Sequence, residues 1–514
     1  FLNERENFYH KPQLNLNWYS QLTEKLNLYS TVYYSGGKGG GTGTYGSMRW
    51  DYSFPSRVVD WDATIAKNDT SSTGSFGILR NSVNRQWTIG AIIKAEYEVN
   101  PMINTLVGID WRTAEIDHYR EVRDLLGGDY YYYDGDEFDT GDHHKGLGDK
   151  VAYDNTNTVN WIAGFAQGEF KQGPLTAFGS AGLSSVKYTF VNHFMKDPDD
   201  PTKKMETKTD MIIGYQAKGG VSYLVMPDLG IFGNAGYVSK PPIFDEVIDD
   251  SDGKKADDPQ NEKFMSAEAG FSWVGLDGLL NIKADGYYTQ WKDQVYRQWV
   301  EVDTLGTEEA LFISGLNSRH VGVEFEATIQ PADFIKFQLN ASKGLWKYTD
   351  DVSAVIKHET EPNDTINVYV KDLKVGNQPQ TQISLSTSIY PFDGFVAKIV
   401  GNHYRDFYSA WNPLDRDDPN DRTQSWKVPN YTTVDLHIMY DIPTIVRGVR
   451  FSIFAHVFNL LDEIYVQDAV DNSSYNCWGS WGAGGTPKYP HTASAAEVFF
   501  GPRRSINMGV EIGL

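Results

Sequence analysis

Apolar and polar residues alternate strictly in long runs along this chain, and the alternation constrains its fold more than any other feature. In residues 321–330 the apolar side chains occupy the odd positions from Val321 to Ile329, and Gly, Glu, Thr and Gln occupy the even positions. The same pattern fills residues 280–289 and 335–342. Because successive side chains of a β-strand point to opposite faces, a period of two predicts strands with one apolar and one polar face.

The lengths of these runs and of their connections indicate a membrane barrel rather than a soluble sandwich. Many runs cover about 10–20 residues, whereas strands of soluble proteins average nearer 5–6. Short connections alternate with long ones that are acidic, polar and aromatic, such as residues 124–154 and 466–494. Tight turns at one rim, long loops at the other and aromatic residues near strand ends are typical of outer-membrane barrels. The predicted turns lie at residues 23–25, 100–101, 171–174, 227–228, 276–278, 331–333 and 391–394.

We therefore predict an all-β fold, a transmembrane antiparallel β-barrel, since a closed sheet is the only strand-built structure that a bilayer tolerates. An aromatic content of 14 % excludes a disordered chain, and a single cysteine, Cys477, excludes a disulfide scaffold. The longest apolar stretch, residues 451–461, is about half the roughly 20 residues that a membrane-spanning helix needs. The net charge of −22 argues against binding to nucleic acid.

A count by run length and turn position gives about 17 strands in this chain. The first clear strand begins at Gln13 and leads into a short turn, and the last alternates from Ser505 to Leu514. Both strands would then run in the same direction, which conflicts with an antiparallel barrel of even strand number. We therefore expect an odd number of further strands before Phe1, with residues 1–9 as the end of a loop. The alternative is that the count is wrong by one strand.

Several short motifs occur in an order that resembles the barrel of TonB-dependent receptors. Each is weak alone, but together they extend over about residues 230–514 and make a strong pattern. They are the segments 236–244, 261–274 with 282–295, 320–326, 428–436, 457–465 and 501–504.

The resemblance implies a 22-stranded barrel that is filled by an N-terminal plug domain. Residues 1–514 would then be one barrel domain that lacks the plug and about five strands. The resemblance also implies the outer membrane and its lipopolysaccharide as surroundings, coupling to the TonB–ExbB–ExbD complex through the plug region, and possible pairing with a surface lipoprotein. A Gly-rich loop start at residues 36–45 and the acidic, Tyr-rich loops resemble receptors of Bacteroidetes-type bacteria.

The function that the resemblance implies is active transport of a scarce extracellular substrate into the periplasm. A ferric chelate or siderophore is favoured, with a cofactor or an oligosaccharide as other substrates. The chain contains neither a Gly-x-Ser-x-Gly elbow nor a phosphate-binding Gly loop, so we do not expect an enzyme. The alternative function is a passive porin or a structural barrel subunit of a larger outer-membrane assembly.

Two aromatic loop segments contain the candidate substrate-binding residues. Flat rings bury area at little entropy cost and stack on sugars or on aromatic chelators. For the segment at residues 475–482, packing within the loop or anchoring at the membrane interface explains the aromatic residues at least as well. The candidates are Tyr131, Tyr133, Tyr475, Trp478 and Trp481.

An acidic segment beside the first pair of tyrosines is a candidate Ca²⁺ site, although no cofactor is required by the predicted function. Ca²⁺ takes six to eight oxygen ligands, and four closely spaced aspartates could supply several of them. The spacing differs from an EF-hand loop, and a solvated acidic loop is the alternative. Two adjacent histidines could bind a transition metal, but a third ligand is not evident. These residues are Asp134, Asp136, Asp139, Asp142, His143 and His144.

Charged residues on the polar faces of the strands are expected to line a wet interior or to contact a plug, because interior positions of a membrane barrel are polar. None of them is expected to be catalytic. They include Lys283, Asp285, Glu324, Glu326, Lys336, Asp435 and His437.

Overall fold

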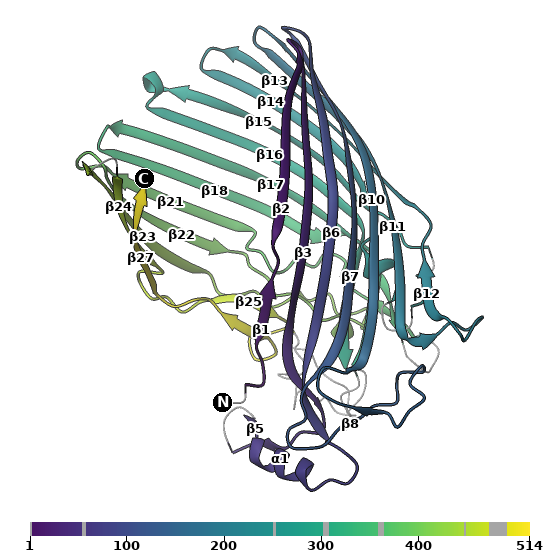
Figure 1. Cartoon of the computed structure of the whole chain (residues 1–514). Coiled ribbons are helices and arrows are strands. Elements are labelled where there is room, and N and C mark those ends of the chain that lie inside the picture. The colour runs from purple at the N-terminus through teal and green to yellow at the C-terminus, as the bar shows by residue number, and fades with distance from the viewer. Residues whose placement is uncertain are drawn as a thin grey trace. The chain divides into compact units, whose positions relative to one another are not determined.

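The computed structural model is almost entirely β-structure (Figure 1). Its long strands form antiparallel hairpins, and a short turn joins the two strands of each hairpin. It describes residues 3–53, 58–249, 253–256, 258–301, 308–357, 364–446, 449–471 and 491–513. Within these residues, 21 strands belong to one large sheet. No helix in the described part of the chain is long and apolar enough to cross a membrane.

In the part of the chain that the structure describes, eight hairpins and one final strand account for 17 long strands, which confirms the number predicted from the sequence. The hairpins are β2 (Gln13–Thr23) with β3 (Leu26–Gly46), β6 (Gly77–Asn100) with β7 (Ile103–Asp124), β10 (Lys150–Gln172) with β11 (Leu175–Lys196), β13 (Ile212–Met226) with β14 (Leu229–Lys240), β15 (Glu262–Gly275) with β16 (Leu280–Glu301), β17 (Glu308–Ala332) with β18 (Ile335–Tyr348), β21 (Thr381–Ile389) with β22 (Phe395–Arg405), and β23 (Tyr431–Val446) with β24 (Val449–Phe458). The final strand is β27 (Ser505–Gly513), which pairs with β24.

All seven short turns predicted from the sequence join the strands of a hairpin, and the predictions are therefore confirmed. The 3-10 helix η1 (Leu276–Gly278) forms one of them, and Asp277 adopts a φ of 55° there. The opposite ends of the strands lead into long connections, as Figure 1 shows for the loop between β3 and β6, which contains α1, and the loop between β7 and β10, which contains β8. The remaining short elements are β1 (Asn7–His10), β4 (Trp50–Asp51), β5 (Val58–Val59), α1 (Trp61–Asp69), β8 (Tyr131–Tyr132), β9 (His144–Lys145), β12 (Lys204–Lys208), α2 (Phe244–Val247), β19 (Val352–Lys357), β20 (Asp364–Val368), η2 (Pro413–Asp415), β25 (Val466–Val470) and β26 (Glu497–Phe500).

The Gly-rich run at residues 36–45 is not the start of a loop, so that prediction is wrong. The run continues β3 and pairs with β6 along its whole length. On its other side it pairs with β1, which occupies part of the segment expected to be a loop end. A Cβ atom at Gly40 would collide with the carbonyl oxygen of Ser82 and lie 2.8 Å from the Phe8 ring. Glycine therefore allows the neighbouring strands to approach β3 closely here.

The chain divides into two compact units, and four strands contribute residues to both. One unit comprises residues 1–169, 180–216 and 240–261, and the other comprises residues 170–179, 217–239 and 262–514. In each unit, buried apolar side chains gather around the long connections. The first unit has one such cluster at Ile78, Val122 and Val151 and another around Phe190. The second has clusters around Trp411 and Phe407.

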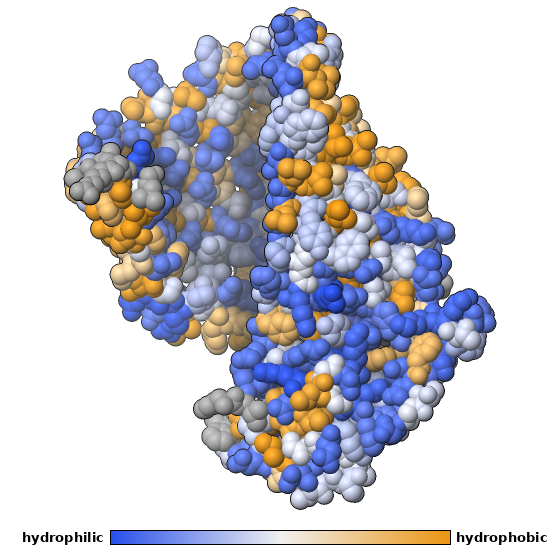
Figure 2. Space-filling view, in the orientation of Figure 1, coloured by the Kyte–Doolittle hydropathy of each residue, from blue (hydrophilic) through white to orange (hydrophobic). Residues whose placement is uncertain are grey.

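Exposure shows which face of the sheet carries the apolar side chains. On β27, the alternating residues Ile506, Met508, Val510 and Ile512 are between 59 and 71 % exposed. The apolar residues of β2 are exposed in the same way, and Figure 2 shows hydrophobic residues gathered over the visible strands, with hydrophilic residues towards α1. A soluble sandwich would bury this apolar face, whereas a membrane barrel places it against lipid.

A charge placed on the apolar face should therefore prevent stable insertion. We predict that Leu385→Arg on β21 destabilises the folded barrel by about 2–4 kcal/mol near the middle of a bilayer. The adjacent Ser384→Arg, on the polar face, is the matched control and should change stability much less. Urea titration of protein folded into lipid vesicles measures both values, and equal destabilisation would contradict the assignment of the faces.

Candidate functional site

A row of aromatic side chains crosses the polar faces of β16, β17 and β18. Tyr287 is paired with Gly322, and Gly322 is paired with Gly344 on the next strand. The indole Nε1 of Trp346 donates a hydrogen bond of 2.9 Å to the Tyr287 hydroxyl. The ring of His320 lies 5.7 Å from the ring of Trp346. We call Tyr287, His320 and Trp346 the aromatic row.

The two glycines make room for the aromatic row. A Cβ atom at Gly322 would collide with the Tyr287 hydroxyl, and one at Gly344 would lie 2.6 Å from the Trp346 indole. The Tyr287 ring can therefore lie over the backbone of β17, and the Trp346 ring can lie over the backbone of its own strand. This surface was not predicted from the sequence. Gly344 stands two residues before Trp346, on the same face of the strand, and this spacing was a signal that could have identified it.

Acidic side chains lie on the same polar face, next to the aromatic row. Asp285, Glu324 and Glu326 border a groove of about 320 Å³, whose other walls include Lys283 and several amides and hydroxyls. Lys283 is 4.0 Å from Glu326, which is the only contact between opposite charges recorded in this groove among the described residues. The structure thus places these charges on one face, as the alternation predicted.

Tyr131 and Tyr133 lie in the loop between β7 and β10, and both pack into the loop rather than standing free. They contact the buried cluster of Ile78, Val122 and Val151. The Tyr133 hydroxyl donates a hydrogen bond of 3.1 Å to the carbonyl of Ala152. Burial, with smaller contributions from Tyr45 and Asp136, raises the pKa of Tyr133 to about 12, so the phenol stays neutral.

The buried amide of Asn68 holds this loop against α1. Its Nδ2 donates to the carbonyls of Gly77 at 2.9 Å and Leu126 at 3.1 Å, and its Oδ1 accepts from the Phe76 N–H at 3.0 Å. Asp60 caps the same helix by accepting from the N–H of Ala63. Helix, strand ends and tyrosine loop are therefore one packed structure.

The four candidate Ca²⁺ ligands have individual roles within the loop. Asp139 forms an ion pair of 2.7 Å with Lys145. This ion pair and a hydrogen bond from the backbone N–H of Gly141 hold the pKa of the Asp139 carboxyl below its usual value. Asp136 and Asp142 accept hydrogen bonds from the N–H groups two residues later, and Asp134 is exposed. Within the described residues, no three His, Cys, Asp or Glu side chains gather in a metal-binding arrangement. The Ca²⁺ site stays a prediction.

The two histidines beside these aspartates contact rings of the same loop. His144 stacks on Tyr130 with ring centroids 3.5 Å apart, and His143 makes an edge contact with Tyr132. Of the other candidates, Tyr475, Trp478 and Trp481 lie outside the described residues, as does Cys477.

Tyr133 tests whether this loop is held by its own packing. We expect Tyr133→Phe to lower the stability of the loop by about 1 kcal/mol, because one hydrogen bond is lost. Tyr132→Ala is the control, since that side chain is half exposed. Hydrogen exchange of the β7–β10 loop measures both, and unchanged protection in Tyr133→Phe would argue against the packing role.

A buried network of charges connects the long loops of the second unit, and sequence reasoning did not identify it. Arg416 is 1 % exposed and donates from Nη1 to the carbonyl of Thr423 at 2.8 Å. Its Nη2 lies 3.2 Å from Asp471 and 3.3 Å from the hydroxyl of Ser425. Buried guanidinium groups need such partners, because an isolated buried charge is strongly unfavourable.

His491 completes this network between two carboxylates. Its Nδ1 lies 2.6 Å from Asp471 and its Nε2 lies 2.7 Å from Asp421. Both carboxylates are acceptors, so the imidazole satisfies both only when it carries two protons. Burial opposes that charged form, but the hydrogen bonds to Asp471 and Asp421 outweigh it and raise the pKa of His491 above its usual value.

The network should therefore respond to pH. A histidine whose pKa is raised on folding stabilises the folded loops fully below about pH 6.5, and this contribution is lost as the pH rises through the folded pKa. We expect hydrogen exchange of residues 413–425 and 466–471 to accelerate more than intrinsic exchange does as the pH rises above about 6.5. In His491→Gln this extra acceleration should be absent. A wild-type protein without it would contradict the network.

Comparisons with known proteins agree with this architecture. Residues 3–460 match the model of a protein family described as TonB dependent receptor-like, beta-barrel. None of the curated protein sequences compared with the chain is significantly similar to it.

Among solved structures, the chain is similar to the copper transporter OprC (16 % identity, TM-score 0.62, covering 99 % of this chain and 68 % of that one). It is similar to the ferric-catecholate import receptor Fiu from Escherichia coli K12 (12 % identity, TM-score 0.58, covering 99 % of this chain and 65 % of that one). It is also similar to the ferric yersiniabactin uptake receptor FyuA from Yersinia pestis (13 % identity, TM-score 0.58, covering 99 % of this chain and 61 % of that one). The chain thus spans about two thirds of the length of these proteins, with which it shares a fold.

Proposed function

Since the chain belongs to the TonB-dependent receptor-like β-barrel family of the bacterial outer membrane, we propose that it captures a scarce extracellular substrate and imports it into the periplasm. The family comprises transporters rather than enzymes. In a closed barrel the apolar face contacts lipid and the polar face lines the interior. The aromatic row then faces the path of the substrate.

The aromatic row is the observation that carries this proposal. Tyr287 and Trp346 are tied to each other by a hydrogen bond, so their rings are held in place before a ligand arrives. Preorganised flat rings bind a planar or ring-bearing ligand at low entropy cost. A ferric chelate such as a siderophore, with its ring-bearing or amide-rich shell, suits this surface. A cofactor or an oligosaccharide is the alternative substrate.

Energy for import would come from the inner membrane. Family membership supports coupling through TonB, and we propose the TonB–ExbB–ExbD complex as the partner, acting through a plug in the barrel. A surface lipoprotein partner and an origin in Bacteroidetes-type bacteria are further proposals that rest on the sequence alone.

Uptake of radiolabelled ferric siderophores by cells that produce the full-length receptor tests the function. We expect Tyr287→Ala with Trp346→Ala to raise the half-saturating substrate concentration about 3- to 10-fold, which corresponds to losing 0.5–1.5 kcal/mol of aromatic contact. Tyr288→Ala is the matched control, because Tyr288 lies next in β16 on the apolar face.

The same assay separates the competing functions. Uptake that persists when TonB is deleted would contradict active transport and indicate a passive porin. Iron uptake that is identical with and without the receptor gene would contradict a ferric-chelate substrate. Dependence of uptake on TonB would then be measured with other nutrients.

A further inference from the structure

A cluster of lysines lies on the apolar face of the sheet, at the end where the long loops begin. Lys343 is two residues from Leu345 on β18 and is paired with Val323, so all three side chains share this face. Lys347 follows on the same face, and Lys374 forms a bridge with it from the neighbouring connection. These lysines therefore lie on the opposite face from the aromatic row.

Two carboxylates neutralise only part of this charge. Asp406 accepts from Lys343 at 2.6 Å and from Lys427 at 2.7 Å. Hydrogen bonds from these two lysines and from Thr381 hold the pKa of Asp406 well below its usual range. A second carboxylate, Asp372, pairs with Lys347 at 2.6 Å. Among the described residues of this cluster, four ammonium groups thus face two carboxylates.

The Lys374 ammonium carries the uncompensated charge. Among the described residues, no carboxylate lies within ion-pair distance of it. Burial, followed by repulsion from Lys347 and Lys343, lowers the pKa of Lys374. An anion placed between these lysines would relieve that repulsion. The concentration of positive charge is notable in a chain whose net charge is −22.

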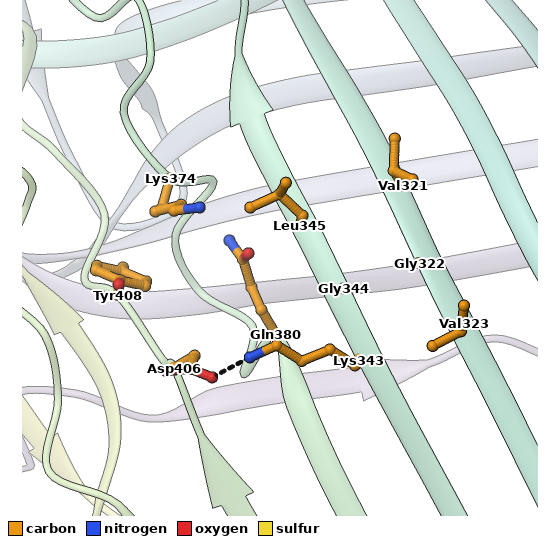
Figure 3. A pocket seen from close by; sticks show the side chains of 10 residues that line it. All are labelled: Val321, Gly322, Val323, Lys343, Gly344, Leu345, Lys374, Gln380, Asp406 and Tyr408. Carbon is orange, nitrogen blue, oxygen red and sulfur yellow. Dashed lines mark hydrogen bonds and ion pairs between the residues drawn. The ribbon is translucent and has the colours of Figure 1, made fainter.

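Two of the lysines, Lys343 and Lys374, border a groove of about 400 Å³ whose two sides differ in chemistry (Figure 3). Val321, Val323 and Leu345 form one side, and the ionic groups with Tyr408 and Gln380 form the other. In Figure 3 the Lys343 ammonium points to Asp406, and Lys374 lies above it from a separate connection. The groove therefore offers an apolar wall and a cationic wall to a single ligand.

We propose that this groove binds a phosphate-bearing lipid of the outer leaflet, with the phosphate at Lys343 and Lys374 and an acyl chain along Val321, Val323 and Leu345. The apolar face meets lipid, and its loop end is where headgroups lie, so the amphiphilic groove matches the ligand at that depth. Lysine binds phosphate as a point charge and needs no fixed geometry. Lipopolysaccharide, expected as a surrounding of the chain, carries such phosphates on its lipid A.

The test compares lipid retention by full-length receptors extracted in mild detergent. The probe is bisphosphorylated lipid A, and the second probe is the same lipid with both phosphates removed. The variant is Lys343→Gln with Lys374→Gln. The control is Lys336→Gln with Lys398→Gln, which changes the same charge on the polar faces of β18 and β22. Native mass spectrometry counts the bound lipid over a concentration series.

We expect the wild type and the control to bind bisphosphorylated lipid A equally. The variant should bind it about 30-fold more weakly, because it lacks two lysines that attract the phosphates at the membrane surface. The dephosphorylated lipid should bind weakly to all three proteins. Equal retention of bisphosphorylated lipid A by variant and wild type would overturn the proposal. Displacement of the lipid by millimolar inorganic phosphate would also overturn it, because the site would then bind a free anion.

The folding of the variant is checked on the same samples. Resistance of the barrel band to unfolding in detergent at room temperature should be the same for the variant and the control. A variant that is folded and still retains the lipid contradicts the proposal directly. Single substitutions at Lys343 and at Lys374 provide a second measure, and each should weaken binding by about 5-fold.

Discussion

The need to pair backbone groups without water determines most of this structure. In a lipid bilayer each unpaired N–H or C=O costs several kcal/mol, so strands can cross only when each pairs with its neighbours. Ladders within the hairpins and between them supply this pairing, and the ladder that joins β3 to β6, two strands of different hairpins, continues over 21 residue pairs. Where a side chain would disturb the ladder, as in the Gly-rich part of β3, the chain uses glycine.

The two faces of the sheet therefore differ in chemistry and in what they contact. The apolar face is exposed in the isolated chain and would be covered by lipid. The polar face carries the aromatic row and an acidic groove, both on β16, β17 and β18. The long connections have their own buried clusters and a charge network at Arg416, so they are folded structures rather than simple links. A substrate that meets these loops meets a surface that is already organised.

The sequence predicted the features that depend on local periodicity. Alternation identified the strands and their faces, and Pro, Asp and Gly residues located the short turns, because these signals act over a few residues. The Gly-rich run misled prediction, since glycine suits both a loop and a strand that neighbours approach closely. The Arg416 network joins segments up to 75 residues apart, and no local pattern marks such partners. Tyr131 and Tyr133 were predicted to bind substrate, and no local pattern marks their long-range packing against Ile78 and Val122, which buries them partly.

Alternate residues of one strand are expected to face lipid and water. Cysteine scanning of β17 tests this expectation most directly, in a Cys477→Ser background that removes the chain's single cysteine. For protein in lipid vesicles, we expect cysteines at positions 323 and 325 to react only with a lipid-soluble maleimide. Cysteines at positions 324 and 326 should react with a charged, water-soluble one. Equal reaction of all four positions with the charged reagent would contradict the account.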